Sequence, residues 1–243
     1  MALALLALCG TLLSRRAALL SGGASMVPTS VFAEGGSKSL HSYSGSPREM
    51  LLEAISAQAS DEEVLQIIKS LTILDPAQGR GASSDALGGS WKLLWSAGAD
   101  KFSPLLSLPR SIRPLSLQLL GAAATAQVGE GRVANLLCFP FGVSMLLSSG
   151  VRPAADSRSC LEILPPFKLE LLFGKQKVTL VEAGSDREFR AINARNKYAQ
   201  GAPRNLYEQQ YLDQAGLPGD LRVSTVVAGD PVIVGSVFVH QRI

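Results

Sequence analysis

The chain has 243 residues, of which 47% are hydrophobic and 18% are charged, and its formal net charge is +3 at pH 7. This composition is typical of a folded globular protein and lies far from that of intrinsically disordered chains. Arg15 and Arg16 are the only charged residues among the first 33, so the remaining chain carries 21 basic and 20 acidic residues. That balance gives no electrostatic basis for binding nucleic acid.

The cysteine pattern excludes a disulfide-rich scaffold. Cys9 lies in the apolar N-terminal run, which leaves Cys138 and Cys160 with no CxxC pair and no histidine at metal-ligand spacing. The pattern allows one bridge between these two thiols or two buried free thiols. No cofactor or metal motif is present, and we expect neither group.

The N-terminus has the features of a targeting leader. Residues 2–13 are apolar, uncharged and too short to span a bilayer, which is typical of the core of a signal peptide. The Arg15-Arg16 pair then precedes a weaker apolar stretch that ends Val31-Phe32-Ala33. We predict that residues 1–33 are a leader cleaved between Ala33 and Glu34. The order of signals fits import into a plastid followed by export to the thylakoid lumen, and one ordinary leader also fits.

Two helices are predicted after a small, polar, flexible linker at residues 34–46. Ser46-Pro47-Arg48-Glu49 combines an N-cap serine, a proline at the first helical position and a glutamate three residues after the cap. The sequence from Ser60 to Glu63 repeats this capping box, and four apolar residues follow it at helical spacing: Val64, Ile67, Ile68 and Leu71. The helical segment is predicted to cover residues 47–80.

Strand signals dominate from Gly89 onward, as short runs of Val, Leu, Ile and Phe between turn residues. Residues 168–173 and 177–181 predict a hairpin, and the turn at residues 229–231 predicts a last strand from Val232 to His240. Residues 184–211 read as a charged crossover containing a helix. About eight or nine strands are expected, a number that suits closure into an antiparallel barrel over residues 81–243, in one domain with residues 47–80.

Several short blocks, in this order, are similar to the plastid lipid-associated protein (fibrillin) family. The blocks are ILDP at 73–76, LGGSWKLLWS at 87–96, YLD at 211–213, DLRV at 220–223 and GSVFVHQR at 235–242. Gln127-Val128 and the run from Val133 to Leu136 are similar to a strand pair of that family carrying a Gln and an Asn. The chain departs from the family by an insertion at residues 214–219 and by Trp95, where a tyrosine is usual.

The resemblance implies a mainly β, lipocalin-like barrel preceded by two N-terminal helices. It also implies a plastid protein at the thylakoid membrane that binds, transports or protects lipophiles such as lipids, quinones or carotenoids. The partners would be a lipophilic small molecule and, peripherally, the membrane. An accessory or assembly subunit of a membrane-bound photosynthetic complex, with no ligand, is the alternative.

A hydrolase is the least favoured reading, and we expect that the chain is not an enzyme. His41 and His240 are the only histidines, and His41 lies in the predicted linker. No GxSxG, HExxH, P-loop or GxGxxG motif occurs in a supporting context.

Five residues are candidates for ligand binding: Trp91, Asn135, Asp213, Arg222 and Phe238. Trp91 and Phe238 either line a ligand site or fill the barrel as core. Asp213 and Arg222 could form a bidentate ion pair at the barrel mouth, because an arginine fork matches a carboxylate. Such a pair either fixes the strand to the preceding loop, the favoured role, or contacts a polar head group. Asn135 either caps a neighbouring backbone or offers a polar group to a ligand.

The segment 101–113, KFSPLLSLPRSIR, combines apolar side chains with cations and no acid. These two ingredients favour reversible attachment to an anionic membrane surface. The predicted contact residues are Phe102, Leu105, Leu106, Arg110 and Arg113. In the competing interpretation, the leucines fold inward as a plug over the end of the barrel.

Overall fold

The computed structural model describes residues 43–98, 105, 108, 112–140, 142–194 and 204–243. The predicted leader and most of the predicted linker lie outside the described residues, so neither prediction is tested. Tyr43–Ile243 fall in one compact unit.

Two capped helices precede the strands, as predicted. Helix α2 spans Pro47–Ser56 and α3 spans Asp61–Thr72. Both capping boxes are formed: the Ser46 and Ser60 hydroxyls accept hydrogen bonds from the backbone N–H groups of Glu49 and Glu63. Each glutamate carboxylate in turn accepts one from the backbone N–H of its cap serine. Two short 3₁₀ turns, η2 (Gly81–Ser83) and η3 (Asp85–Leu87), then lead into the first strand.

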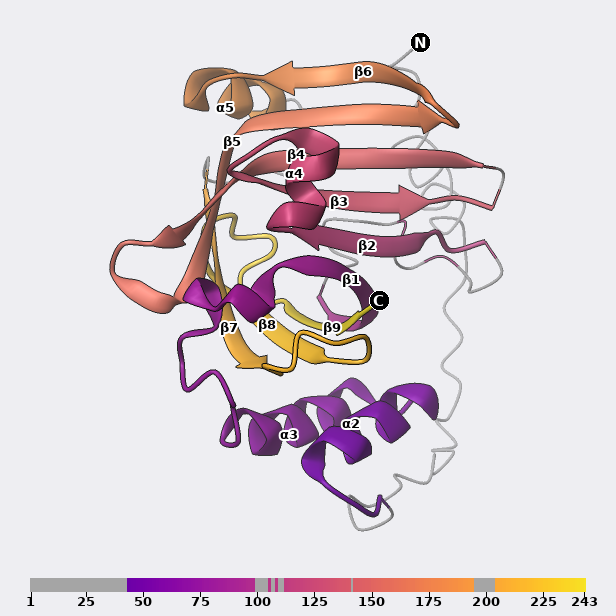
Figure 1. Cartoon of the computed structure of the whole chain (residues 1–243), viewed down its shortest axis with the longest axis vertical. Coiled ribbons are helices and arrows are strands. Elements are labelled where there is room, and N and C mark those ends of the chain that lie inside the picture. The colour runs from indigo at the N-terminus through magenta and orange to yellow at the C-terminus, as the bar shows by residue number, and fades with distance from the viewer. Residues whose placement is uncertain (1–42, 99–104, 106–107, 109–111, 141, 195–203) are drawn as a thin grey trace, which may run out of the picture. The chain divides into compact units, whose positions relative to one another are not determined.

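Nine antiparallel strands form one sheet that closes on itself (Figure 1). The strands are β1 (Gly89–Ala97), β2 (Leu115–Leu120), β3 (Arg132–Cys138), β4 (Val143–Ala154), β5 (Ser157–Phe173), β6 (Gln176–Ala183), β7 (Asn205–Leu212), β8 (Leu221–Ala228) and β9 (Val237–Arg242). Their order is β4-β3-β2-β1-β9-β8-β7-β5, and pairing of β5 with β4 closes an eight-stranded barrel to which β6 adds one strand. The predicted mainly β, antiparallel barrel is confirmed.

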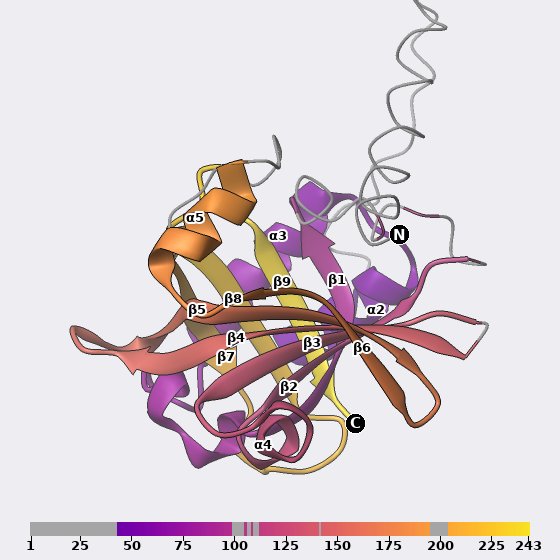
Figure 2. The same ribbon diagram turned by 90° about the horizontal axis from the view of Figure 1, so that it is seen from above.

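Strand β5 changes partner halfway along its length. Its first half, Cys160–Ile163, pairs with β7, and its second half, Phe167–Phe173, pairs with β6 in the predicted hairpin. Strand β4 pairs with β5 along both halves. The sheet made by β2 to β6 therefore continues past the closed ring, with β6 as its last strand (Figure 2).

Helices cover apolar side chains on the outer face of the barrel. Helices α2 and α3 pack Leu51, Ile67 and Leu71 against Val223 and Val239, among others, on β8 and β9 (Figure 1). Helix α4 (Ala122–Val128) similarly packs on Leu119, Ala134 and Leu146 of β2 to β4. Since neighbouring residues of a strand point to opposite faces, the residues between these positions face the interior.

Three predictions about the elements need correction. The segment 184–211 contains helix α5 (Asp186–Ala194), but its second half includes all but the last residue of strand β7. The last strand begins at Val237 rather than at Val232, because Val232 to Ser236 form a turn that returns backbone hydrogen bonds to Asp230 and Val226. Gln127 lies in helix α4 and not in a strand beside Asn135.

Candidate functional site

The interior of the barrel contains a buried arginine with unusual surroundings. Arg222 on β8 is 1% exposed, and its Nη2 donates a hydrogen bond of 2.5 Å to Oε1 of Gln118 on β2. Strands β1 and β9 separate β8 from β2 in the sheet. The hydrogen bond therefore crosses the interior, and the guanidinium points into the barrel.

A second hydrogen bond continues this polar chain toward solvent. Nε2 of Gln118 donates to Oδ1 of Asn135 on β3 at 3.1 Å. Both amides are half-buried, whereas the guanidinium of Arg222 is fully buried. The chain from Asn135 through Gln118 to Arg222 thus leads from a partly solvated position to a dry one.

Trp91 is close to Arg222 and to a second arginine, Arg242. The two guanidinium carbons are 5.0 and 4.4 Å from the centre of the indole ring, within the range of cation–π attraction. The indole N–H donates to the carbonyl of Leu87 at 2.9 Å. Trp91 also packs in the apolar floor of the barrel, which we define as Leu87, Trp91, Leu120, Val133, Leu161 and Leu212.

Arg242 is held by groups that accept its hydrogen bonds and offset its charge. It donates to the backbone carbonyls of Ala86 and Gly88, and its Nε is 3.7 Å from a carboxylate oxygen of Asp220. Gly89 makes room for this arrangement. Its φ is +137°, and a Cβ there would collide with Nη1 of Arg242.

Arg222 has no such compensation. Among the described residues it forms no ion pair within 4.0 Å. Its buried Nε, like that of Arg242, has no hydrogen-bond partner among them. Burial, reinforced by the positive charge of Arg242, lowers the pKa of Arg222 to about 9, which leaves it charged at neutral pH. The interior therefore holds a desolvated positive charge that no anion of the described residues balances.

His240 lies directly beside Arg222 on the neighbouring strand. The two residues are paired across β8 and β9, and the His240 ring stacks on the Phe238 ring at a centroid distance of 6.2 Å. Among the described residues, its buried Nδ1 has no hydrogen-bond partner. Burial, and then the charge of Arg222, lower the pKa of His240 well below its usual value. His240 is therefore neutral at pH 7 and adds an unmet polar atom to the site.

Apolar side chains line the inner face beyond this polar group. Directly opposed residues share a face, so the register places Asn135, Leu147, Leu169 and Val181 in one row. The next row holds Leu137, Met145, Leu171 and Val178. Exposure rises along it, from half-buried Leu137 to Val178, which is 47% exposed. We call these two rows, without Asn135, the inner apolar rows.

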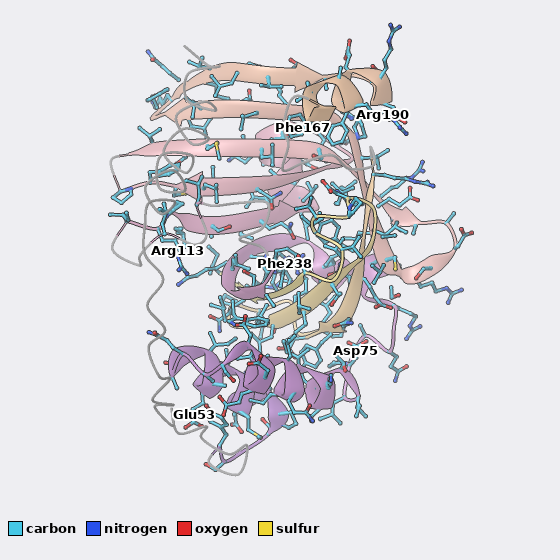
Figure 3. The ribbon with its side chains drawn as sticks, turned by 180° about the vertical axis from the view of Figure 1, so that it is seen from behind. Glu53, Asp75, Arg113, Phe167, Arg190 and Phe238 are labelled. Carbon is cyan, nitrogen blue, oxygen red and sulfur yellow. The ribbon has the colours of Figure 1, made fainter. Side chains whose placement is uncertain are left out.

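Four of the five predicted ligand-binding residues meet in the barrel. Trp91, Asn135 and Arg222 belong to the hydrogen-bonded and stacked group described above. Phe238 is buried inside the ring of strands (Figure 3). Its ring centroid lies 6.2 Å from that of Tyr207 and 6.2 Å from that of His240.

The predicted ion pair between Asp213 and Arg222 does not form. Asp213 follows β7 and pairs with Arg48 of helix α2 at 3.0 Å. Its carboxylate also accepts hydrogen bonds from the Tyr211 hydroxyl at 2.6 Å and the Leu221 N–H at 2.8 Å. Asp213 therefore ties helix α2 and the β7–β8 connection together, while Arg222 points into the barrel.

The predicted membrane segment is described only in part. Phe102, Leu106 and Arg110 lie outside the described residues. Leu105 is half-buried, and Arg113 is exposed and donates from Nε to the carbonyl of Leu108 at 2.9 Å. The membrane prediction for this segment stays open.

Gln118 and Arg242 were not predicted from the sequence, and His240 was a candidate only for a weakly supported catalytic role. In the run Leu117-Gln118-Leu119 the leucines would ordinarily be assigned to the barrel core and the glutamine to solvent. Helix α4 reverses this assignment, because it covers Leu119 on the outer face. The alternating pattern of this strand therefore does distinguish its two faces. The face with Gln118 is the interior one, and the face with the leucines is the outer one.

A separate hollow of about 470 Å³ lies outside the barrel, beside the end of α3 and strand β7. Asp75, which follows α3, lines this hollow. Its carboxylate already accepts hydrogen bonds from the backbone N–H groups of Ala77, Gly79 and Leu212. Figure 3 shows Asp75 at this junction. Its carboxylate therefore has a structural role.

Cys138 and Cys160 are free thiols, so the open question of a bridge is answered. Within the described ranges, no three His, Cys, Asp or Glu side chains are grouped to hold a metal ion. The described helices are all too short or too polar to cross a bilayer.

Comparison with known proteins adds no relative. The chain matches no model of a known protein family, no curated protein and no solved structure.

Proposed function

We propose that this protein binds, transports or protects a lipophilic molecule on the inner face of its barrel, next to a membrane. The observation that carries the proposal is the exposure of the inner apolar rows. Leu137, Met145 and Leu171 are only half-buried, and Val178 is 47% exposed. A contiguous apolar surface of this kind is typical of a binding site, because leaving it in water is unfavourable.

The distribution of helices supports the same proposal. Helices α2, α3 and α4 cover the outer apolar face of the barrel, whereas the inner apolar rows keep solvent contact. The floor is filled by side chains such as Trp91 and Leu212. A ligand would therefore lie on the β2–β6 side, above the floor, rather than run through the barrel.

The leader and the family resemblance extend the proposal to a place in the cell. They favour a plastid protein at the thylakoid, with lipids, quinones or carotenoids as candidate ligands. The near-neutral net charge gives no electrostatic basis for nucleic acid as a competing ligand.

A matched pair of variants tests the proposed surface. Val178 on the inner face and Val227 on the outer face of β8 are similarly exposed, at 47% and 43%. A glutamate at position 178 would place a charge against the ligand, whereas one at position 227 would face water. We expect Val178→Glu to weaken binding of a fluorescent lipophile about tenfold, as a lost apolar contact and a desolvated charge require, and Val227→Glu to leave it unchanged.

The alternative function, a ligand-free accessory subunit, gives the opposite result. Neither the parent nor the two variants would then bind the probe. Equal weakening by both variants would place the binding surface elsewhere on the molecule.

A further inference from the structure

We infer that the ligand carries a compact anionic head group, as a fatty carboxylate does, and that Arg222 receives this head group inside the barrel. This inference rests on the proposed function and specifies the ligand's chemistry. Two arginines, Arg222 and Arg242, lie close to the same indole ring, and only Arg242 has a carboxylate partner among the described residues.

Arg222 and Arg242 differ in their partners and not in their burial. Both are at most 9% exposed, and both lie within 5.0 Å of the Trp91 ring centre. Arg242 has Asp220 and two carbonyl oxygens, whereas the described neighbours of Arg222 offer one amide oxygen. A buried charge without a counterion is strongly unfavourable, so the arrangement is complete only when an anion arrives.

The polar groups around Arg222 suit an oxygen-rich head group. Gln118 and Asn135 are half-buried amides on the path from solvent to the guanidinium. The free Nδ1 of His240 lies on the other side, on the strand paired with β8. The planar guanidinium fork matches a carboxylate in two parallel hydrogen bonds, and the amides can adjust as donors around it.

The inner apolar rows start at the same level of the barrel. Asn135 stands opposite Leu147, which stands opposite Leu169. A single apolar chain attached to a head group at Arg222 would therefore lie along these side chains toward Val178. The floor at Trp91, Leu120 and Leu212 prevents a deeper position.

Calorimetric titration with two probes of the same tail, laurate and dodecanol, tests this inference. The full chain is expected to bind laurate about tenfold or more tightly than dodecanol, the usual effect of a charge-assisted hydrogen bond. Arg222→Met should abolish the preference, and Arg222→Lys should retain part of it. Arg158→Met, which changes an exposed arginine of β5, should bind like the parent.

A measurement on the unaltered protein gives a second readout. The carboxyl carbon of ¹³C-labelled laurate reports its ionisation by NMR. When bound beside Arg222, the laurate carboxyl should titrate at lower pH than free laurate, because the guanidinium stabilises its ionised form.

Four results would overturn the inference. Equal affinity for laurate and dodecanol, or a preference that survives in Arg222→Met, would remove the head-group role of Arg222 and leave the proposed function standing. A bound carboxyl that titrates like the free one would do the same. Failure of both probes to bind would overturn the inference and the proposed function together.

Discussion

At the scale of single residues, the barrel interior is built around two guanidinium groups and one indole ring. Cation–π contacts to Trp91 attract both arginines, but they do not replace a counterion. Arg242 has one in Asp220, and Arg222 has none among the described residues. The two arginines should therefore respond oppositely to removal.

We expect Arg222→Met to be as stable as the parent or more stable, because the change removes an unbalanced buried charge and loses one hydrogen bond worth about 1 kcal/mol. Arg242→Met should be destabilised by on the order of 3 to 5 kcal/mol, because it leaves Asp220 and two carbonyls buried without their partner. Urea unfolding of the two variants measures both effects. Similar losses in both would show that Arg222 is compensated as well as Arg242.

The buried His240 should make stability depend on pH. Its pKa is lowered in the folded protein, so between that value and 6.5 the unfolded chain binds a proton that the folded chain does not. Stability is therefore full above pH 6.5 and falls as the pH drops below it, by up to about 1.4 kcal/mol per pH unit. The urea concentration at the midpoint of unfolding should fall from pH 7 to pH 5 in the parent and in the control variant His41→Gln. It should fall less in His240→Gln. An unchanged decline in His240→Gln would contradict the assignment.

At the scale of elements, local signals predicted the structure well and long-range ones did not. The capping boxes at Ser46 and Ser60 and the β5–β6 hairpin depend on neighbours in sequence, and all three are formed. The start of the last strand was wrong, because Ile233 packs with Val226 and Phe238 in a turn rather than in a strand. An apolar run alone does not distinguish these two fates.

The partners of Arg222 and Asp213 could not be predicted because they depend on the order of strands. Arg222 meets Gln118 across two intervening strands, and Asp213 meets Arg48 from a helix 165 residues away. Proximity along the chain favoured pairing the two with each other. Trp91, Asn135 and Phe238 were placed more successfully, since their strands were recognised.

Exposed apolar residues at or near the strand ends allow the predicted membrane attachment to be tested on residues that the structure describes. We define the rim as Ile112, Leu115, Phe173 and Val178, which are 42 to 54% exposed. Arg113 lies between Ile112 and Leu115 in the sequence. Leu115 and Leu172, the neighbour of Phe173, belong to one row of paired residues across the sheet, with Cys138 and Ser144 between them. Apolar groups flanked by a cation are the elements of reversible docking to anionic lipid.

We expect the protein to float with anionic vesicles at low salt and to detach as salt shortens the screening length. A variant with Ile112→Ser and Leu115→Ser should float less. The control changes Ile73 and Leu74 to Ser, two still more exposed residues next to α3 that lie outside the rim. Equal loss in both variants would remove the special role of the rim.

At the scale of the whole molecule, the described unit separates its functions by face. The outer face of the barrel is covered by α2, α3 and α4 and contributes stability. The floor closes the interior with packed apolar side chains around Trp91. The inner apolar rows keep solvent contact, and Arg222 has no counterion among the described residues; we propose that both serve the ligand.

We propose that the barrel carries a lipophile, and organic extraction of the protein purified from its natural source tests this claim. Organic extraction followed by mass spectrometry should release about one lipophilic molecule per chain, since a barrel of eight strands has room for a single small ligand. An unrelated protein purified by the same steps defines the background. Extracts that contain no lipophile above that background would contradict the claim and favour a ligand-free accessory subunit.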